Sequence, residues 1–200
     1  MKFFICASIV PLACMILLCG NQHLHADIVW DESVNGDLSG DPLGPTPLTY
    51  GIGANTIIAS VSEPDGDLRD YITFSIGPNQ FLTSLTLDAF SPNGFSFQGI
   101  NAGNTSYIPD FGTAGNFLGL DFVSDSMVGT NMLLGLSLGD YGSIGFAIPL
   151  GEGTYSYVFQ ELTPGESRNY QITFHVVPEP ASAGLSCLAG LFLLTRRRRK

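Results

Sequence analysis

The sequence predicts an all-β fold, an antiparallel β-sandwich or jelly roll, in the central part of a 200-residue chain. Three observations support this class. Short segments of alternating apolar and polar residues are separated by Gly, Pro, Asn and Asp, which is typical of strands joined by turns. No long helical period occurs between the two termini. All four cysteines lie in the terminal apolar stretches, so the central part must be stabilised by packing rather than by disulfides.

The first 26 residues have the three regions of a secretory signal peptide, and we expect the apolar region to be helical. Lys2 supplies the charge, residues 3–20 are uncharged and largely apolar, and a polar stretch ends at Ala26. We predict cleavage after Ala26, which leaves a mature chain that begins at Asp27. Leu24 lies where a small residue is expected, so an uncleaved N-terminal anchor is the alternative.

The domain between residues 27 and 177 contains eight segments with the pattern of strands. Eight short strands at this spacing are typical of a sandwich or jelly roll. Residues 101–115 are rich in Gly and Asn and predict a long surface loop. The expected strands are 56–61, 71–76, 85–89, 95–100, 133–138, 144–150, 155–160 and 170–176.

The central domain is strongly acidic. All 18 acidic residues lie between Asp27 and Glu179, where Arg69 and Arg168 are the only basic residues, so the formal net charge of this span is −16. Such a surface repels phosphate backbones, and no basic cluster is present to release counterions, so nucleic-acid binding is disfavoured. We expect such a surface to attract cations or cationic partners. The absence of cysteine also excludes a thiolate zinc site and a cysteine nucleophile from this span.

The densest acidic group lies just before one predicted strand and is a candidate calcium site. Carboxylate oxygens are the ligands that this hard cation prefers. The alternative is a solvated turn, because Asp65 is followed by Gly66, a common turn pair. No cofactor other than calcium is predicted. The candidate ligands are Glu63, Asp65, Asp67 and Asp70.

A second acidic segment imitates the start of an EF-hand loop. Asn35, Asp37 and Ser39 alternate and Gly40 follows, as in a calcium-binding loop. The twelfth position of such a loop is Thr46 instead of the required glutamate. The pattern therefore favours a turn stabilised by its own polar side chains over an EF-hand.

Residues 135–139 match the G-x-S-x-G motif of serine hydrolases, with Ser137 at its centre. The motif needs a following helix, and the sequence instead predicts a further strand. The one histidine outside the signal peptide is His175, which falls on the outward side of a predicted strand. A serine hydrolase is therefore disfavoured. A polysaccharide hydrolase with paired carboxylates stays the alternative, since sequence spacing cannot exclude a pair about 5–10 Å apart.

Several aromatic residues are candidates for a sugar-binding surface. The alternation of Tyr155, Tyr157 and Phe159 favours instead one inward, core-forming face. The remaining candidates have no such pattern. They are Phe117, Tyr107 and Tyr141.

The C-terminal 23 residues have a tripartite order. Pro178, Glu179 and Pro180 precede an apolar stretch, residues 181–195, which is followed by Arg196, Arg197, Arg198, Arg199 and Lys200. As a helix the apolar stretch spans about 22 Å, shorter than the roughly 30 Å hydrocarbon core, and the basic tail is expected on the cytoplasmic side. An ordinary membrane anchor is the alternative.

This order closely resembles the PEP-CTERM sorting signal of Gram-negative bacteria. The resemblance implies export across the inner membrane, recognition by an exosortase-type membrane protease and cleavage near Pro178–Pro180. It also implies a transient C-terminal membrane anchor, followed by release or attachment at the cell surface, often in organisms that make exopolysaccharide.

The central domain resembles, less specifically, the bacterial pre-peptidase C-terminal domain. That resemblance implies a non-catalytic β-sandwich, of a kind in which some members bind calcium or an extracellular polymer. No peptidase domain precedes it here, which is a departure from the usual setting. The matching residues are Trp30, Asp31, Glu32, Gly36, Asp37, Leu38, Ser39, Asp67, Asp70, Tyr71, Thr73, Phe74, Gly153, Thr154, Tyr155, Tyr170, Ile172 and Phe174.

The sequence therefore predicts an exported, non-catalytic protein of the cell surface or extracellular matrix. Its expected partners are the export machinery, the exosortase-type protease and, for the domain itself, exopolysaccharide or calcium. A structural envelope component with no specific ligand is a further alternative.

Overall fold

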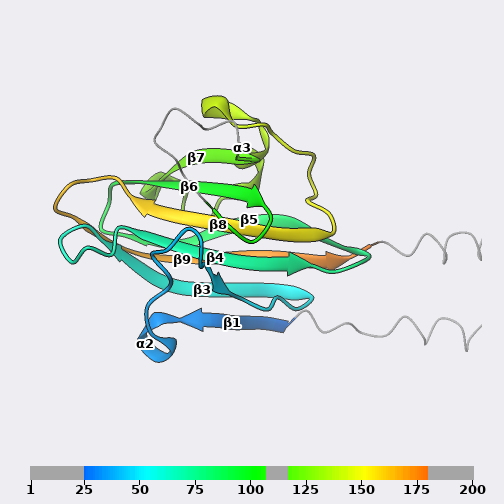
Figure 1. Cartoon of the computed structure of the whole chain (residues 1–200), viewed down its shortest axis with the longest axis horizontal. Coiled ribbons are helices and arrows are strands. Elements are labelled where there is room, and N and C mark those ends of the chain that lie inside the picture. Colours follow the sequence, from blue (N-terminus) through cyan, green and yellow to red (C-terminus); the bar gives the residue numbers. More distant parts are fainter. Residues whose placement is uncertain (1–24, 107–116, 180–200) are drawn as a thin grey trace, which may run out of the picture.

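The computed structural model describes residues 25–106 and 117–179, and these residues form two β-sheets packed on each other (Figure 1). The all-β prediction is confirmed. One sheet, sheet A, has the strand order β1-β3-β9-β5, and the other, sheet B, has the order β2-β4-β8-β6-β7. The strands are β1 (His25–Asp31), β2 (Thr46–Pro47), β3 (Gly53–Ser62), β4 (Arg69–Ile76), β5 (Gln80–Ser91), β6 (Phe95–Ala102), β7 (Gly119–Ser124), β8 (Gly153–Glu161) and β9 (Ser167–Pro178).

The sheets are not purely antiparallel, which corrects the predicted fold class. β1 pairs with β3 in parallel, and β2 pairs with β4 in parallel, while the other five pairings are antiparallel. A parallel pair needs a long crossover connection. Residues 32–52, which include helix α2 (Glu32–Asn35) and β2, supply that crossover between β1 and β3.

The core lies between the two sheets. In β8, Tyr155, Tyr157 and Phe159 point inward from sheet B, which confirms the predicted inward face. In β9, Ile172 and Phe174 do the same from sheet A. The ring of Phe174 contacts the rings of Phe74 and Tyr157 in edge-on arrangements, which are favourable for aromatic pairs.

Two predicted strands are wrong. Residues 133–138 contain helix α3 (Leu133–Ser137), in which Leu133 and Leu136 are buried and Leu134 is exposed. This i, i+3 spacing is that of one helix face rather than the i, i+2 spacing of a strand face. Residues 144–150 form no strand, and Leu150 forms an isolated β-bridge with Leu82. Ile144 and Ile148 are exposed, so burial of their side chains does not favour a strand here.

The other six predicted strands are confirmed within β3, β4, β5, β6, β8 and β9. The alternation pattern predicts no strand at β1, β2 or β7. The predicted loop at 101–115 begins within β6, and its residues 107–116 lie outside the described residues. The predicted signal helix and the apolar helix 181–195 also lie outside them.

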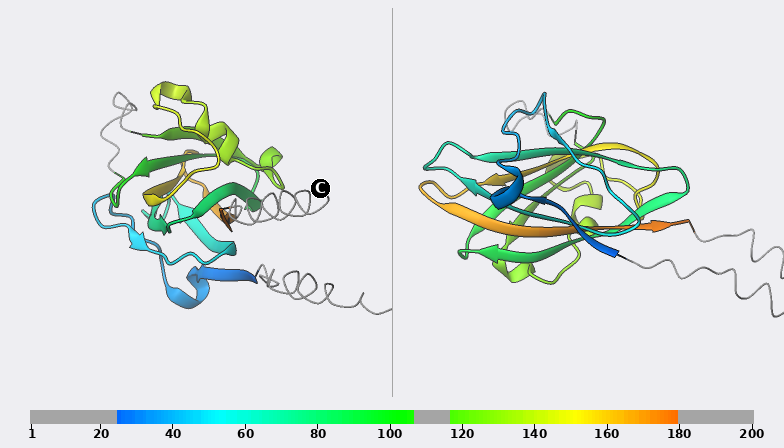
Figure 2. Two further views of the ribbon diagram at one scale, coloured as in Figure 1. Left: turned by 90° about the vertical axis from the view of Figure 1, so that its right-hand side faces the viewer. Right: turned by 90° about the horizontal axis from the view of Figure 1, so that it is seen from below.

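The described chain begins and ends at the same end of the sandwich (Figure 2). His25 pairs with Gly53, which pairs with Val176 near the end of β9. α2 follows β1 at the opposite end, about 20 Å away along a seven-residue strand. Among residues 25–106 and 117–179, no helix is long and apolar enough to cross a membrane.

Candidate cation site

A short turn after β1 positions the first carboxylate. Asp31 caps α2, because its Oδ1 accepts hydrogen bonds from the backbone N–H and the hydroxyl of Ser33. The indole N–H of Trp30 donates to the carbonyl of Gly36 and closes the turn. Gly36 has a φ of 88°, a left-handed conformation that glycine adopts without strain. The chain therefore reverses directly after α2 and brings Asp37 back toward Glu32.

Glu32 ties this turn to sheet A. Its Oε2 accepts hydrogen bonds from the backbone N–H of Ser60, at 2.7 Å, and from the Ser60 hydroxyl, at 3.0 Å. Its Oε1 accepts from the N–H of Leu38 at 3.3 Å. The carboxylate is thus held in place by three donors while remaining half-buried.

Asp70 lies at the start of β4 in sheet B and is only 1 % exposed. Its Oδ2 accepts a 2.7 Å hydrogen bond from the hydroxyl of Tyr170 in β9, across the sandwich. Its Oδ1 is buried and has no hydrogen-bond partner. A buried carboxylate oxygen without a hydrogen-bond partner lowers the free energy of unfolding, so a ligand bound to this atom would stabilise the protein.

The three carboxylates of Glu32, Asp37 and Asp70 converge. One oxygen from each lies within 4.8 Å of the others. Asp70 forms the buried end of this acidic cluster, Glu32 is half-buried and Asp37 is exposed at the solvent side. Calcium bonds of about 2.3–2.6 Å allow two of its oxygen ligands to be this far apart.

Burial and mutual repulsion raise the pKa values of the carboxyl groups here. Burial is the first cause for Asp70, whose pKa is well above its usual range, and for Glu32, whose pKa is also raised. The pKa of Asp67 is raised to about 7, first by burial and then by the charges of Asp37, Glu32 and Asp65. A bound cation would favour the charged forms and reverse these shifts.

The acidic cluster is not neutralised by either arginine of the described chain. Arg69 donates from Nε to the side-chain oxygen of Gln160. Arg168 forms its ion pairs with Glu161 and Glu166. The negative charge of the cluster is therefore available to a mobile cation.

The structure divides the acidic group predicted at residues 63–70. Asp70 is in the cluster, and Asp67 is close enough to influence it electrostatically. Asp65 instead accepts a hydrogen bond from the hydroxyl of Ser62, and Glu63 accepts one from the N–H of Gly165. These two side chains are exposed, and their hydrogen bonds lie outside the cluster.

The EF-hand-like segment, residues 35–46, forms a turn stabilised by its own polar side chains, as the sequence predicts. Asn35 accepts a hydrogen bond from the N–H of Asp31, and the Ser39 hydroxyl accepts one from the N–H of Asp41. The Thr46 hydroxyl accepts from the N–H of Ser39. Only Asp37 from this segment joins the cluster.

Sequence patterns did not single out Glu32 as a ligand, and they placed Asp37 in a different group from Asp70. The parallel crossover brings these residues together, and no local spacing encodes it.

The serine motif has a different geometry from a nucleophile elbow. Ser137 ends helix α3 instead of preceding a helix, and its hydroxyl donates to the carbonyl of Leu134. His175 lies in β9. Among the aromatic candidates, Phe117 is buried, Tyr141 is exposed against the ring of Phe122, and Tyr107 lies outside the described residues.

The sorting residues fall at the edge of the described chain. Pro178 ends β9, and the N–H of Glu179 donates to the carbonyl of Asn79. Pro180 and Arg196 to Arg199 lie outside the described residues. Ala26, the predicted cleavage residue, is the second residue of β1.

Compared with known proteins, the chain matches no protein-family model and no curated protein sequence.

Proposed function

We propose that this chain is an exported, non-catalytic protein of the cell surface or extracellular matrix whose β domain binds calcium. One observation carries the proposal: three carboxylates from separate segments converge within 4.8 Å around Asp70, whose buried Oδ1 has no partner. The ligands are Glu32, Asp37 and Asp70, with Asp67 contributing charge.

Calcium suits this arrangement better than magnesium or zinc. The cluster offers only oxygen atoms, which disfavours zinc, and the ligands come from a turn, the first residue of a short exposed helix and a strand. Calcium accepts such irregular geometry and completes its shell with water, whereas magnesium demands a near-ideal octahedron. Extracellular calcium modules bind at about 0.1–1 mM, the range expected for a site with one exposed ligand.

The sorting signal fits the position of this site. Export through the secretory pathway and processing by an exosortase-type protease deliver the domain to the cell exterior. The chain enters and leaves the domain at one end, and the cluster lies at the other. A domain held through its C-terminus therefore presents the calcium site away from the membrane.

The carboxylates near the cluster have structural roles that disfavour the alternative of a hydrolase. Asp31 caps α2, and Glu32 accepts three hydrogen bonds from Ser60 and Leu38. A general acid and base must exchange protons with a substrate, whereas Asp31 and Glu32 accept hydrogen bonds from backbone N–H groups and serine hydroxyls, which favour their charged forms. This supports a binding role over glycoside hydrolysis.

Calorimetric titration of calcium into the full chain, purified in mild detergent, tests the proposal. Wild-type protein should bind one calcium ion, with a rise in thermal midpoint that EDTA reverses. Asp37→Asn should weaken binding at least about tenfold, since it removes a charged ligand.

Two further variants make the result specific. Asp70→Asn should also lose binding, while Asp140→Asn removes an exposed carboxylate after α3 and should bind as wild type. Asp37 is exposed, so its substitution should leave folding intact even if Asp70→Asn does not fold. Absence of heat and of any EDTA-sensitive midpoint shift in wild type would refute the calcium site.

A further inference from the structure

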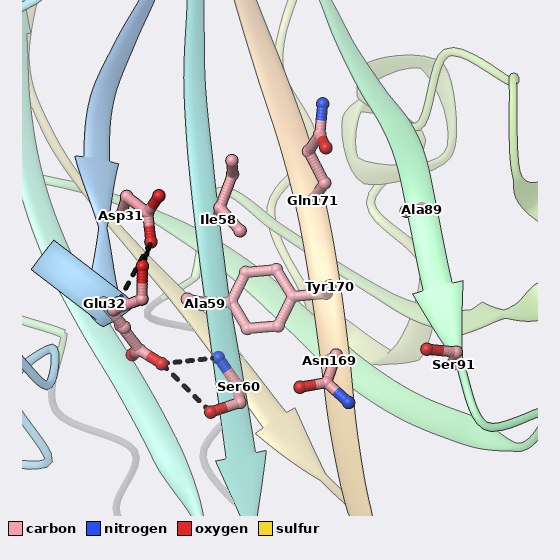
Figure 3. Close-up of a pocket in the computed structure, with 11 residues that line it drawn as sticks. Asp31, Glu32, Ile58, Ala59, Ser60, Ala89, Ser91, Asn169, Tyr170 and Gln171 are labelled. Atoms are coloured by element: carbon pink, nitrogen blue, oxygen red, sulfur yellow. Dashed lines mark hydrogen bonds between the residues drawn. The ribbon is translucent and has the colours of Figure 1, made fainter.

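A groove of about 460 Å³ crosses the solvent-facing side of sheet A, next to the acidic cluster (Figure 3). Its lining comes from all four strands of this sheet and from α2. Glu32 belongs to both the groove and the cluster. The groove therefore lies at the same end of the domain as the proposed calcium site.

One row of polar side chains runs straight across the groove. Ser60 in β3 is directly opposite Asn169 in β9, and Asn169 is directly opposite Ser91 in β5. Residues opposite one another on neighbouring strands project to the same side of the sheet. The row thus presents a hydroxyl, an amide and a second hydroxyl side by side (Figure 3).

A second row, two residues further along each strand, combines one amide with apolar groups. Ile58 is opposite Gln171, and Gln171 is opposite Ala89. The methyl groups of Ile58 and Ala89 flank the amide of Gln171 on the same face. The first row of the groove therefore offers three hydrogen-bonding side chains, and the second row offers one amide between two small apolar side chains.

The central polar groups are free to bind a ligand. In the part of the chain that the structure describes, the side chains of Asn169, Gln171 and Ser91 have no hydrogen-bond partner among protein groups. Each amide can donate and accept, as can the serine hydroxyl. This matches the hydroxyl groups of a sugar, which also donate and accept.

The charge of the groove selects against anionic ligands. No lysine or arginine lines it, and Asp31 and Glu32 lie at one end. An anionic polymer would be repelled and would find no counter-charge. The groove also runs over a sheet face, where the backbone hydrogen bonds of β3 and β9 are already made, so a peptide cannot add to it as a strand.

We propose that this groove binds a neutral, hydroxyl-rich glycan chain, with Asn169 and Gln171 as the central contacts. Sugar hydroxyls bond to the two amides and to Ser91, and the C–H faces of the rings lie against Ile58 and Ala89. The inference deepens the proposed function and rests on its extracellular location, but the groove needs no bound calcium.

Calorimetric titration of the full chain with glycans tests the inference. The neutral probes are dextran, galactomannan and xyloglucan, and the anionic probes are alginate and polygalacturonate, all in EDTA. Wild-type protein should bind at least one neutral polymer and neither anionic one. The double variant Asn169→Ala/Gln171→Ala should bind at least about tenfold more weakly, the loss expected from two hydrogen bonds.

Asn104→Ala is the matched control, because it removes an exposed amide that does not line this groove and should leave glycan affinity unchanged. The double variant should keep the wild-type thermal midpoint and calcium affinity. Binding of no neutral polymer, binding that the double variant retains, or binding of the anionic polymers alone would overturn the inference. Glycan binding without calcium heat would instead refute the calcium site and leave the groove standing.

Discussion

The guanidinium Nε of Arg168 lies 3.3 Å from Oε2 of Glu161, and the two side chains are 2 % and 0 % exposed. Arg168 also pairs with Glu166 at 3.2 Å and donates to the hydroxyl of Thr163. Arg168, one of two arginines in the domain, therefore forms a buried ion pair that links the end of β8 to the start of β9. Removing one partner would leave the other charge buried without compensation.

Arg168→Met should lower the free energy of unfolding by about 3–5 kcal/mol, measured by urea denaturation. Arg69→Met is the control: Arg69 is half-buried and bonds to the neutral Gln160, so its loss should cost about 1 kcal/mol. Equal losses for the two variants would contradict a special role for the buried pair.

Much of the fold followed from alternation in the sequence, and its failures have physical causes. The alternation predicts the strands 71–76 and 170–176 because apolar residues that are buried in the core, such as Phe74 and Ile172, occupy every second position. β1 was missed because it is an edge strand with exposed residues such as Ile28, so it has no clear apolar face. The acidic cluster was missed because a crossover, which leaves no periodic signal, brings Glu32 to Asp70.

The corrected helix makes its own prediction. Leu136 is fully buried in α3 and Leu134 is 55 % exposed, whereas a strand would place both on one face. Leu136→Ala should cost about 2–5 kcal/mol of unfolding free energy, and Leu134→Ala less than about 0.5 kcal/mol. Urea denaturation of both variants checks this. Similar losses at the two positions would support a strand with a common buried face and contradict the helix.

The proposed processing at the two termini predicts a defined mass for the mature protein. Intact-mass measurement of the surface fraction should show a chain that starts at Asp27 and ends near Pro178–Pro180. Replacing Pro178, Glu179 and Pro180 with alanine should leave the basic tail attached, because the recognised motif is gone. Glu152→Ala, an exposed change elsewhere, should be processed normally. A wild-type surface form that retains the arginine tail would refute the sorting proposal.

The raised pKa of Asp67 predicts how stability depends on pH without calcium. The folded-state pKa is about 7 against 3.8 for the ordinary group, so between these values the folded protein binds more protons than the unfolded chain. Stability must then fall as pH rises from about 4 to about 7. Asp70 and Glu32, whose pKa values are also raised, act in the same direction.

In EDTA, the thermal midpoint of the wild-type chain should therefore be higher at pH 5.5 than at pH 8. Asp67→Asn should raise the midpoint at pH 8 and flatten this dependence, because it removes a charge that the folded state disfavours. Asp140→Asn removes an exposed carboxylate outside the acidic cluster and controls for the general loss of one negative charge. Calcium should stabilise the protein most at pH 8, where protons no longer neutralise the cluster. A midpoint that rises with pH in EDTA would contradict the raised pKa values of these carboxyl groups, which come first from burial and then from the neighbouring negative charges.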